Sequence, residues 1–320
     1  MNNDFVLSVV IITYNKLNYL KTVLKNLNYQ TKLRNVEFVV VTDGSKDGTK
    51  EFLDGLETKF NLKKINIPNS GAAVARNTGI RNSTGDNILF IDDDILIEPL
   101  YISKLLKSLA KYPDRVHAGN IRLIPLDKVP AVMELMDSGA VVGNRTLSKI
   151  SYTDAIYGTL QVAYRNNNDA EISCWWGLVT GGNICFPRAV IEEVGYFDDS
   201  FKNWGPEDID LTYRGFKKNF KLKFNSTANL YHMDHSRNPM EIKEAMARNV
   251  SLLLKKYQKA PDILSYINFF NGMTSLNAFN SVCLQSLPNA PKVELEEYYI
   301  SLDYYLEKGQ MINWKKNESN

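Results

Sequence analysis

The chain has 320 residues, of which 44% are hydrophobic and 23% charged, as expected for a globular protein with a substantial core. A formal net charge of +2, with neither half conspicuously basic, argues against a nucleic-acid-binding surface. The three cysteines have no CxxC spacing, so we expect reduced thiols in a cytoplasmic protein, without a disulfide framework or a zinc site.

The first hundred residues alternate between strand-like and helix-like segments. VLSVVIIT (6–13) is continuously apolar and β-branched, as expected for a buried strand, and it is too short to span a membrane. Asn15 is predicted to cap the following helix. This helix and its successors are expected at 17–27, 47–60 and 72–82, with further strands at 36–43, 62–68 and 86–92. Such alternation predicts a mostly parallel, Rossmann-like α/β sheet flanked by helices, with ligands at the carboxyl ends of its strands.

The second half is expected to change character near Asn238–Pro239. Before this point we predict a strand at 179–186, a helix at 188–194, a helix from 207 to about 219, and short strands ending at 231. The rest is predicted to be helical, at 241–257, 262–270 and 293–309, which divides the chain into an α/β domain (1–238) and a helical extension (239–320). The extension ends in aromatic and basic residues that could pack on the α/β domain, bind a partner, or touch the inner face of a membrane: Tyr298, Tyr299, Tyr304, Tyr305, Trp314, Lys315 and Lys316.

Three consecutive aspartates, Asp92–Asp94, interrupt the apolar segment ILFIDDDILI. Carboxylates about 5 Å apart repel each other by roughly 3 kcal/mol at an effective dielectric constant of about 20. A solvated turn would relieve this repulsion, but the position at the ligand edge of a parallel sheet favours Mg²⁺ or Mn²⁺ shared with substrate phosphates. In an extended segment Asp92 and Asp94 share one face and Asp93 points away.

Two more segments carry candidate site residues. NWGPEDIDL (203–211) places Glu207 and Asp208 at a helix start, where carboxylates are stabilised. Trp204 and Gly205 lie just upstream, and the Trp204 indole could pack on a sugar. An ordinary acidic helix cap is the alternative. YHMDHSRN (231–238) holds His232 and His235, either of which could be a third metal ligand or a surface histidine.

Several phosphate and metal motifs are excluded. The sequence contains no GxxxxGK[ST], and no GxGxxG follows the first strand. DGSKDGTKEFLD (43–54) nearly fits a calcium-binding loop, but an apolar strand precedes it and Lys50 occupies a position that is usually apolar. We therefore reject a calcium site.

Seven blocks, taken in order and spacing, resemble those of the inverting family 2 glycosyltransferases, which have the GT-A fold. The resemblance covers about residues 5–238 and rests on LSVVIITYNK, VVVTDGSKDGT, GAAVARNTGI, FIDDD, TGGN, GYFD and WGPEDIDLTYR. The last block is also similar to the galactosyltransferase-type WGxED segment. The resemblance implies metal-dependent transfer of a hexose from a nucleotide-diphosphate sugar, usually a UDP-sugar, to the hydroxyl of a glycan, glycolipid, peptide or small molecule.

The family pattern also implies roles for individual residues. Asp208 would be the catalytic base, and Glu207 would contact a sugar. Asp94 would bind the metal directly, with Asp92 as a further metal or ribose ligand. The family pattern does not settle which histidine binds the metal; we prefer His232 over His235, because His232 directly follows the predicted strand. The nucleotide-sugar site would include Thr13, Tyr14, Asn15, Asp43, Arg76, Asp92, Asp93, Gly181, Gly182 and Trp204. One departure from the pattern is Thr42, which replaces the first of two aspartates that often end the second strand.

The implied reaction is a single displacement that inverts the anomeric carbon, with one base and one Mn²⁺ or Mg²⁺ ion. Two other functions stay open. One is a sugar-nucleotide-binding protein without transferase activity. The other is a sugar-nucleotide pyrophosphorylase, although TYNKLNYL lacks the glycines of the N-terminal loop of that class.

Overall fold

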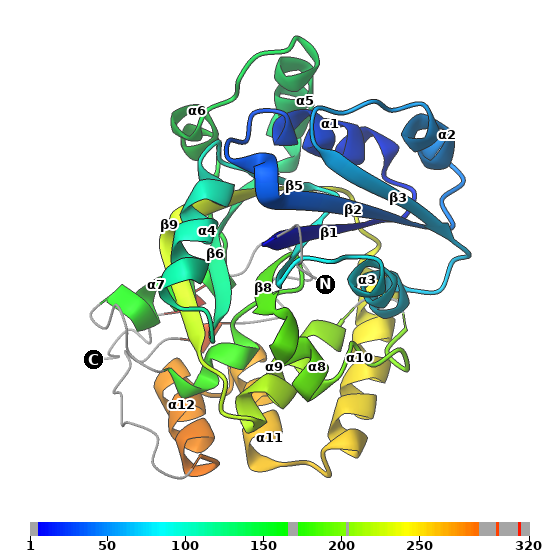
Figure 1. Cartoon of the computed structure of the whole chain (residues 1–320). Helices are drawn as coiled ribbons and strands as arrows, with labels where there is room; N and C mark the ends of the chain where they lie inside the picture. The colour runs from blue at the N-terminus through cyan, green and yellow to red at the C-terminus, as the bar shows by residue number, and fades with distance from the viewer. Residues whose placement is uncertain (1–5, 166–171, 203–204, 288–298, 301–312, 315–320) are drawn as a thin grey trace.

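The computed structural model describes residues 6–165, 172–202, 205–287, 299–300 and 313–314. Within this part, a nine-stranded sheet organises the chain (Figure 1). Its strand order is β3 (Asn61–Ile67), β2 (Val36–Asp43), β1 (Leu7–Thr13), β4 (Asn87–Asp92), β8 (Asn183–Pro187), β6 (Val116–Ile124), β9 (Leu222–Met233) and β5 (Ile95–Ile97), with β7 (Tyr152–Thr153) beside β6. The strands β1 to β4 run parallel to one another, whereas β8 is antiparallel to its neighbours β4 and β6. The predicted GT-A type fold is therefore confirmed.

Helices cover both faces of the parallel half of the sheet. α1 (Leu17–Leu27) and α2 (Thr49–Asp54) lie on one side, and α3 (Ala72–Arg81) lies on the other (Figure 1). Right-handed crossovers explain this arrangement, because the chain steps outward from β1 to β3 and then returns across the sheet to β4. Every residue of β2, and all but one of β1, is buried, in keeping with their uninterrupted apolar sequences.

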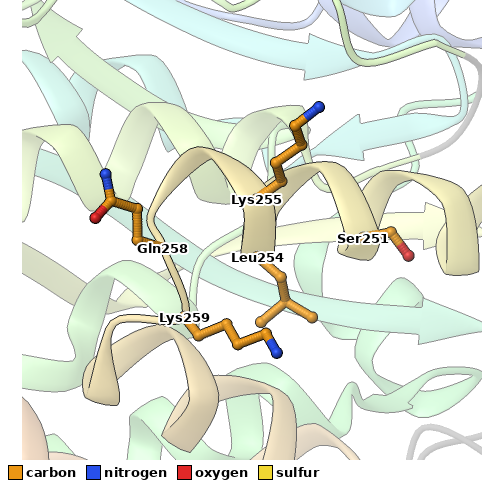
Figure 2. Close-up of a pocket in the computed structure, with 5 residues that line it drawn as sticks. All are labelled: Ser251, Leu254, Lys255, Gln258 and Lys259. Carbon is orange, nitrogen blue, oxygen red and sulfur yellow. The ribbon is translucent and has the colours of Figure 1, made fainter.

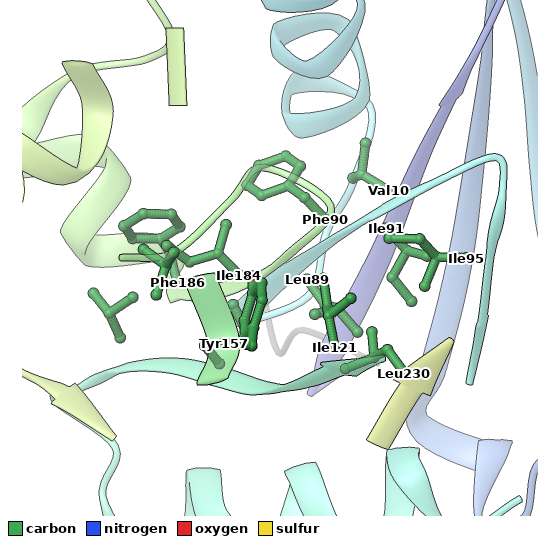
Figure 3. Packing of buried hydrophobic residues seen from close by; sticks show 14 of the residues in the cluster. Val10, Leu89, Phe90, Ile91, Ile95, Ile121, Tyr157, Ile184, Phe186 and Leu230 are labelled. Atoms are coloured by element: carbon green, nitrogen blue, oxygen red, sulfur yellow. The ribbon is translucent and has the colours of Figure 1, made fainter. Parts of the chain in front are cut away.

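The core continues without a break from the parallel strands into the mixed half of the sheet. Phe90 of β4 lies opposite Val10 of β1 on one side and Ile184 of β8 on the other, and its ring centre is 6.5 Å from that of Phe186. Ile121 of β6 belongs to the same cluster (Figure 3). All of these side chains are at least 95% buried. Close packing of this kind fixes the strand ends relative to one another, and these ends carry the predicted site.

The remaining helices are α4 (Tyr101–Lys111), α5 (Val129–Asp137), α6 (Asn144–Lys149), α7 (Ala155–Arg165), α8 (Arg188–Val194), α9 (Glu207–Lys217), α10 (Pro239–Lys256), α11 (Pro261–Phe270) and α12 (Leu276–Gln285). The C-terminal helices pack on α9 and on the short helix Ser173–Gly177. Within that short helix, the ring of Trp176 lies 4.8 Å from Tyr213, 5.2 Å from Tyr266 and 5.5 Å from Phe279, measured between centroids. The division into domains at 238/239 stays a prediction.

Several expected elements differ from those observed. The helix predicted at 47–60 is limited to α2, the strand predicted at 179–186 begins only at Asn183, and the short strands before Tyr231 form one twelve-residue strand, β9. Asn15 does not cap α1: it has a left-handed backbone (φ 52°), and Lys16 occupies the cap position.

The predicted C-terminal helix is wrong at Tyr299–Ile300, which form β10 and pair with β11 (Asn313–Trp314). The other residues of that prediction, with Tyr298, Tyr304, Tyr305, Lys315 and Lys316, lie outside the described residues. In the part of the chain that the structure describes, no helix is both long and apolar enough to cross a membrane.

Candidate active site

The ends of β1, β2 and β4 bring the predicted nucleotide residues to one edge of the sheet. Thr13 pairs with Thr42, and Ile12 pairs with Asp92, so the residues that follow these strands emerge together. The Asp43 carboxylate accepts hydrogen bonds from the backbone N–H groups of Ser70 (2.7 Å) and Gly71 (2.9 Å), just before α3. Asp43 is thereby held at the strand edge.

The loop after β1 is tied to the loop after β2. The Asn15 side-chain oxygen accepts a hydrogen bond from the Lys46 N–H (2.7 Å), and the Asn15 N–H donates to Ser45 Oγ (3.0 Å). The left-handed backbone at Asn15 permits this exchange, since asparagine tolerates that conformation better than most residues. Tyr14, which is half exposed, lies on the same loop and is open to solvent. The roles of these residues in nucleotide binding stay predictions.

The three aspartates point in different directions from those expected. β4 ends at Asp92, Asp93 and Asp94 form a turn, and β5 begins at Ile95. Asp92 therefore faces Arg76 (3.1 Å), whereas Asp93 and Asp94 both face Lys16 Nζ, at 3.5 and 2.5 Å. The prediction that Asp92 and Asp94 share a face is wrong, because the extended backbone that it assumed stops at Asp92.

Burial also rules out a solvated turn for the aspartate cluster. Asp93 and Asp94 are 5% and 3% exposed. Burial raises the pKa of Asp93 to about 7. Burial alone would also raise the pKa of Asp94, but the charges of His232 and Lys16 lower it well below its usual range. Asp94 is therefore a buried carboxylate surrounded by groups that favour its charge.

Pairing of β5 with β9 brings the two histidines to Asp94. Ile95 lies opposite His232, and the Met233 N–H donates a hydrogen bond to the Asp94 carbonyl (2.9 Å). Nε2 of His232 lies 3.5 Å from Asp94 Oδ2, and Nε2 of His235 lies 3.3 Å from it. One ligand atom from each of the three residues lies within 4.8 Å of the others, and Asp92 is not part of this group. We call Asp94, His232 and His235 the metal-ligand cluster.

The cluster is arranged to hold a cation. The Nδ1 atom of His235 is 3.1 Å from the Ser236 carbonyl, which can only accept, and Nε2 is 2.9 Å from the Lys16 ammonium, which can only donate. In the tautomer with the hydrogen on Nδ1, Nε2 presents its lone pair, as a metal ligand must. The buried Oδ1 of Asp94 has no hydrogen-bond partner among the described residues. Both histidines fit, so the preference for His232 stays a prediction.

The predicted base lies at the start of α9. Asp208 Oδ2 accepts a hydrogen bond from the Gly181 N–H (2.7 Å), and Oδ1 accepts one from the Ile209 N–H (2.8 Å). Burial, followed by the neighbouring charge of Glu207, raises the pKa of Asp208 to about 6. The carboxylate is thus oriented by the backbone and titrates near neutral pH.

The two glycines of TGGN lie against charged side chains. A Cβ atom on Gly181 would lie 2.9 Å from the Arg76 guanidinium carbon, and one on Gly182 would lie 2.5 Å from an Asp92 carboxylate oxygen. Any side chain here would displace the Arg76–Asp92 pair. The groups that the two glycines approach in this structure are thus Arg76 and Asp92, and their place in the nucleotide-sugar site stays a prediction.

Arg76 on α3 connects the aspartate cluster with the base. Its Nη1 donates to Glu207 Oε1 (2.5 Å), its Nη2 donates to Asp92 Oδ1 (3.1 Å), and its guanidinium lies 5.5 Å from the centre of the Phe197 ring. Burial alone would lower the pKa of Arg76, but the charges of Asp92 and Glu207 raise it above its usual range. Arg76 is thus a permanent cation shared by both halves of the site.

Sequence reasoning missed two residues of this site. Lys16 was overlooked although it directly follows Asn15, and Phe197 was not singled out although it belongs to the GYFD block. Trp204 lies outside the described residues. Farther along α9, the buried Asp210 bonds to Tyr257 (2.7 Å) and Lys256 (2.6 Å), so α10 braces the helix that carries the base.

Two surface pockets lie away from the sheet edge that carries the candidate site. One is formed by α10 and the turn after it (Figure 2), and is lined by Ser251, Leu254, Lys255, Gln258 and Lys259. The other is lined by Val6, Lys32, Arg34, Asn35 and Leu106. No predicted site residue lines either pocket. At the candidate site, the side chains of Lys16 and Arg76 instead reach across the edge and pair with its carboxylates.

Comparison with known proteins identifies the family. Residues 8–195 match the model of glycosyl transferase family 2, and residues 163–236 match that of the N-terminal domain of galactosyltransferase. The first match spans more than half of the chain, so the chain belongs to glycosyl transferase family 2. The second match contains Glu207 and Asp208.

Individual relatives agree with this assignment. The chain is 24% identical to chondroitin synthase of Escherichia coli, over 80% of this chain and 38% of that protein. It is 30% identical to validoxylamine A glucosyltransferase of Streptomyces hygroscopicus, over 65% of this chain and 50% of that protein. It spans only about a quarter to two fifths of the first three relatives. The crystal structure of S. aureus TarS 1-349 has a similar fold, with a TM-score of 0.57 and 20% identity over 82% of this chain and 70% of that one.

Proposed function

We propose that this chain is an inverting hexosyltransferase that moves a sugar from a nucleotide-diphosphate sugar to an acceptor hydroxyl. One observation carries the proposal: Arg76 pairs both with Asp92, two residues before Asp94 of the metal-ligand cluster, and with Glu207, which adjoins the base candidate Asp208. The leaving diphosphate needs a cation nearby, and the attacking hydroxyl needs a base nearby. Family membership supports the same reaction class.

Asp208 would accept the proton of the acceptor hydroxyl as that oxygen attacks the anomeric carbon. A pKa of about 6 suits this task, because the group is ionised at neutral pH yet still basic enough to take a proton. The N–H groups of Gly181 and Ile209 hold the carboxylate in place, and Glu207 would contact a sugar hydroxyl while paired with Arg76. A single displacement by this route inverts the anomeric configuration.

Asp94, His232 and His235 would hold the divalent ion. When bound, the ion would stabilise the negative charge that grows on the leaving diphosphate. Imidazole nitrogens are poor ligands for Mg²⁺, which prefers oxygen, whereas a mixed nitrogen and oxygen set suits Mn²⁺ better. Of the two ions predicted from the sequence, we therefore propose Mn²⁺.

We propose UDP as the nucleotide. TarS, whose fold is similar, has been crystallised with UDP-GlcNAc and with UDP. The strand-end residues Thr13, Tyr14, Asn15 and Asp43 are the proposed contacts to base and ribose.

We also propose that the enzyme is cytoplasmic and that it touches the inner face of the membrane if its acceptor is a glycolipid. A glycan, peptide or small-molecule acceptor would not require that contact.

A thermal shift experiment tests the nucleotide and metal sites together. UDP with Mn²⁺ should raise the melting temperature more than either alone, because a ligand at 100 times its Kd adds about 2.7 kcal/mol to the stability. Asp94→Ala should abolish this joint effect. Asp137→Ala is the matched control, since that aspartate is exposed and pairs only with surface Lys25 in the described structure. An undiminished joint shift in Asp94→Ala would overturn the metal site.

A screen of nucleotide sugars would then identify the donor. Metal-dependent hydrolysis of one donor by the wild type, and its loss in Asp94→Ala, would support transferase chemistry. Binding of UDP and Mn²⁺ without turnover of any donor or acceptor would instead favour a sugar-nucleotide-binding protein.

A further inference from the structure

The ammonium group of Lys16 lies among the atoms of the metal-ligand cluster. Its Nζ is 2.5 Å from Asp94 Oδ2 and 2.9 Å from His235 Nε2. These are two of the three residues whose ligand atoms converge within 4.8 Å. A divalent ion bound to the same two atoms would need the space that the ammonium occupies.

The surroundings of Lys16 favour its position. Asp93 lies 3.5 Å from Nζ, and the ring of Tyr19 lies 5.8 Å from it, centre to nitrogen. The Lys16 side chain is 26% exposed, so it can leave this position without unfolding the core. Lysine also has a long flexible stem, which lets a charged head move while its backbone stays in place.

We propose that Lys16 is a built-in counter-cation that competes with the divalent metal for Asp94 and His235 and leaves them when the metal binds. This inference rests on the proposed metal site. The ammonium neutralises the buried Asp94 carboxylate in the protein alone, which explains how closely spaced carboxylates are tolerated there. The same ion pair weakens the binding of a metal that arrives without a nucleotide.

The position of Lys16 in the chain also links the metal to the nucleotide. Lys16 directly follows Asn15, on the loop that is hydrogen-bonded to Ser45 and Lys46 beyond β2. An ammonium displaced from Asp94 therefore stays between the metal-ligand cluster and the proposed nucleotide edge, where a diphosphate would attract it. A nucleoside diphosphate should thus relieve the competition, so metal and nucleotide bind more tightly together than separately.

Calorimetric titration of Mn²⁺ into the full chain tests the competition. In the absence of nucleotide, Lys16→Met should bind Mn²⁺ at least about tenfold more tightly than the wild type. A tenfold change in Kd corresponds to about 1.4 kcal/mol of binding free energy. Lys16→Gln, which keeps a hydrogen-bond donor but no charge, should behave similarly and serves as a second variant if Lys16→Met does not fold. Lys25→Met is the matched control, because Lys25 lies on α1, the helix that Lys16 precedes, but pairs with exposed Asp137. The Mn²⁺ affinity of this variant should equal that of the wild type.

Two further measurements complete the test. Without metal, Lys16→Met should melt at a lower temperature than the wild type, and saturating Mn²⁺ should reduce that difference. UDP should tighten Mn²⁺ binding by a larger factor in the wild type than in Lys16→Met, because only the wild type has a competing ammonium to displace.

The outcomes separate this inference from the proposed function. Unchanged or weaker Mn²⁺ binding in both charge-removing variants, together with loss of binding in Asp94→Ala, would overturn the competition and leave the metal site standing. Mn²⁺ binding that does not depend on Asp94 in any background would overturn the metal site and the inference with it. An equal loss of stability with and without Mn²⁺ would make Lys16 a purely structural residue.

Discussion

Replacing Asp208 with asparagine should separate catalysis from folding and from donor binding. The variant keeps the shape of the side chain and removes the proton acceptor. Loss of a general base typically costs about 10²–10⁴-fold in rate, so transfer should fall within that range. Mn²⁺-dependent UDP binding should persist, because the metal-ligand cluster and the nucleotide edge do not include Asp208.

The structure also gives the expected change in stability. Asparagine can accept only one of the two backbone hydrogen bonds, from Gly181 and Ile209, and losing the other, a bond to a charged group, costs about 1.5–3 kcal/mol. In the opposite direction, the pKa of Asp208 is about 6 rather than 3.8, so at pH 7 its charge costs at most about 3 kcal/mol, which the amide avoids. The two effects oppose each other and are similar in size, so we expect Asp208→Asn to be about as stable as the wild type at pH 7.

The pH dependence of this difference gives an independent check. Since the folded pKa lies above the unfolded one, the cost of the Asp208 charge is absent below about pH 4, grows as the pH rises, and is complete above about pH 6. The stability of Asp208→Asn relative to the wild type, measured by urea unfolding, should therefore increase from pH 4 to pH 7. A variant that transferred sugar at nearly the wild-type rate would refute the base assignment, and one that lost UDP binding would place Asp208 in the nucleotide site.

Two further predictions concern the other site residues. If His232 is the stronger metal ligand, calorimetry should show a greater loss of Mn²⁺ affinity for His232→Ala than for His235→Ala. The reverse ranking would make His235 the principal ligand. Unchanged Mn²⁺ affinity in both variants would make both histidines structural. Glu207→Gln should reduce both the rate of transfer and the stability, because the buried Arg76 loses a charged hydrogen-bond partner and keeps only Asp92. Such a bond contributes about 1.5–3 kcal/mol. If urea unfolding gave the variant the same free energy of unfolding as the wild type, the Arg76–Glu207 pair would contribute nothing to the fold.

The parts of the fold that follow from local sequence could be predicted. Uninterrupted apolar runs gave β1, β2 and β4 to within a residue or so, and parallel pairing then placed their polar ends on one edge. The predicted end of this strand at Asp92 is correct, but the turn at Asp93–Asp94 could not be predicted in this way. Two further aspartates between two apolar runs give no local signal that the backbone leaves the extended conformation there.

Long-range ion pairs explain what else was missed. A lysine at the start of an exposed amphipathic helix has the sequence appearance of a solvated residue, and nothing local indicates that Lys16 reaches Asp94, 78 residues away, or His235, 219 residues away. Asp210 is similar: its buried bond to Tyr257 depends on how α10 packs against α9. Such contacts follow from tertiary packing and leave no periodic pattern in the sequence.

The charge balance of the site connects these ion pairs with the proposed need for metal. Carboxyl groups at Asp92, Asp93, Asp94, Glu207 and Asp208 face the permanent cations Lys16 and Arg76. The elevated pKa values of about 7 and 6 for Asp93 and Asp208 reflect that excess of negative charge together with burial. A donor diphosphate would add more negative charge at the same edge. We therefore expect that binding such a donor needs additional positive charge, which a divalent cation at the proposed metal site would supply.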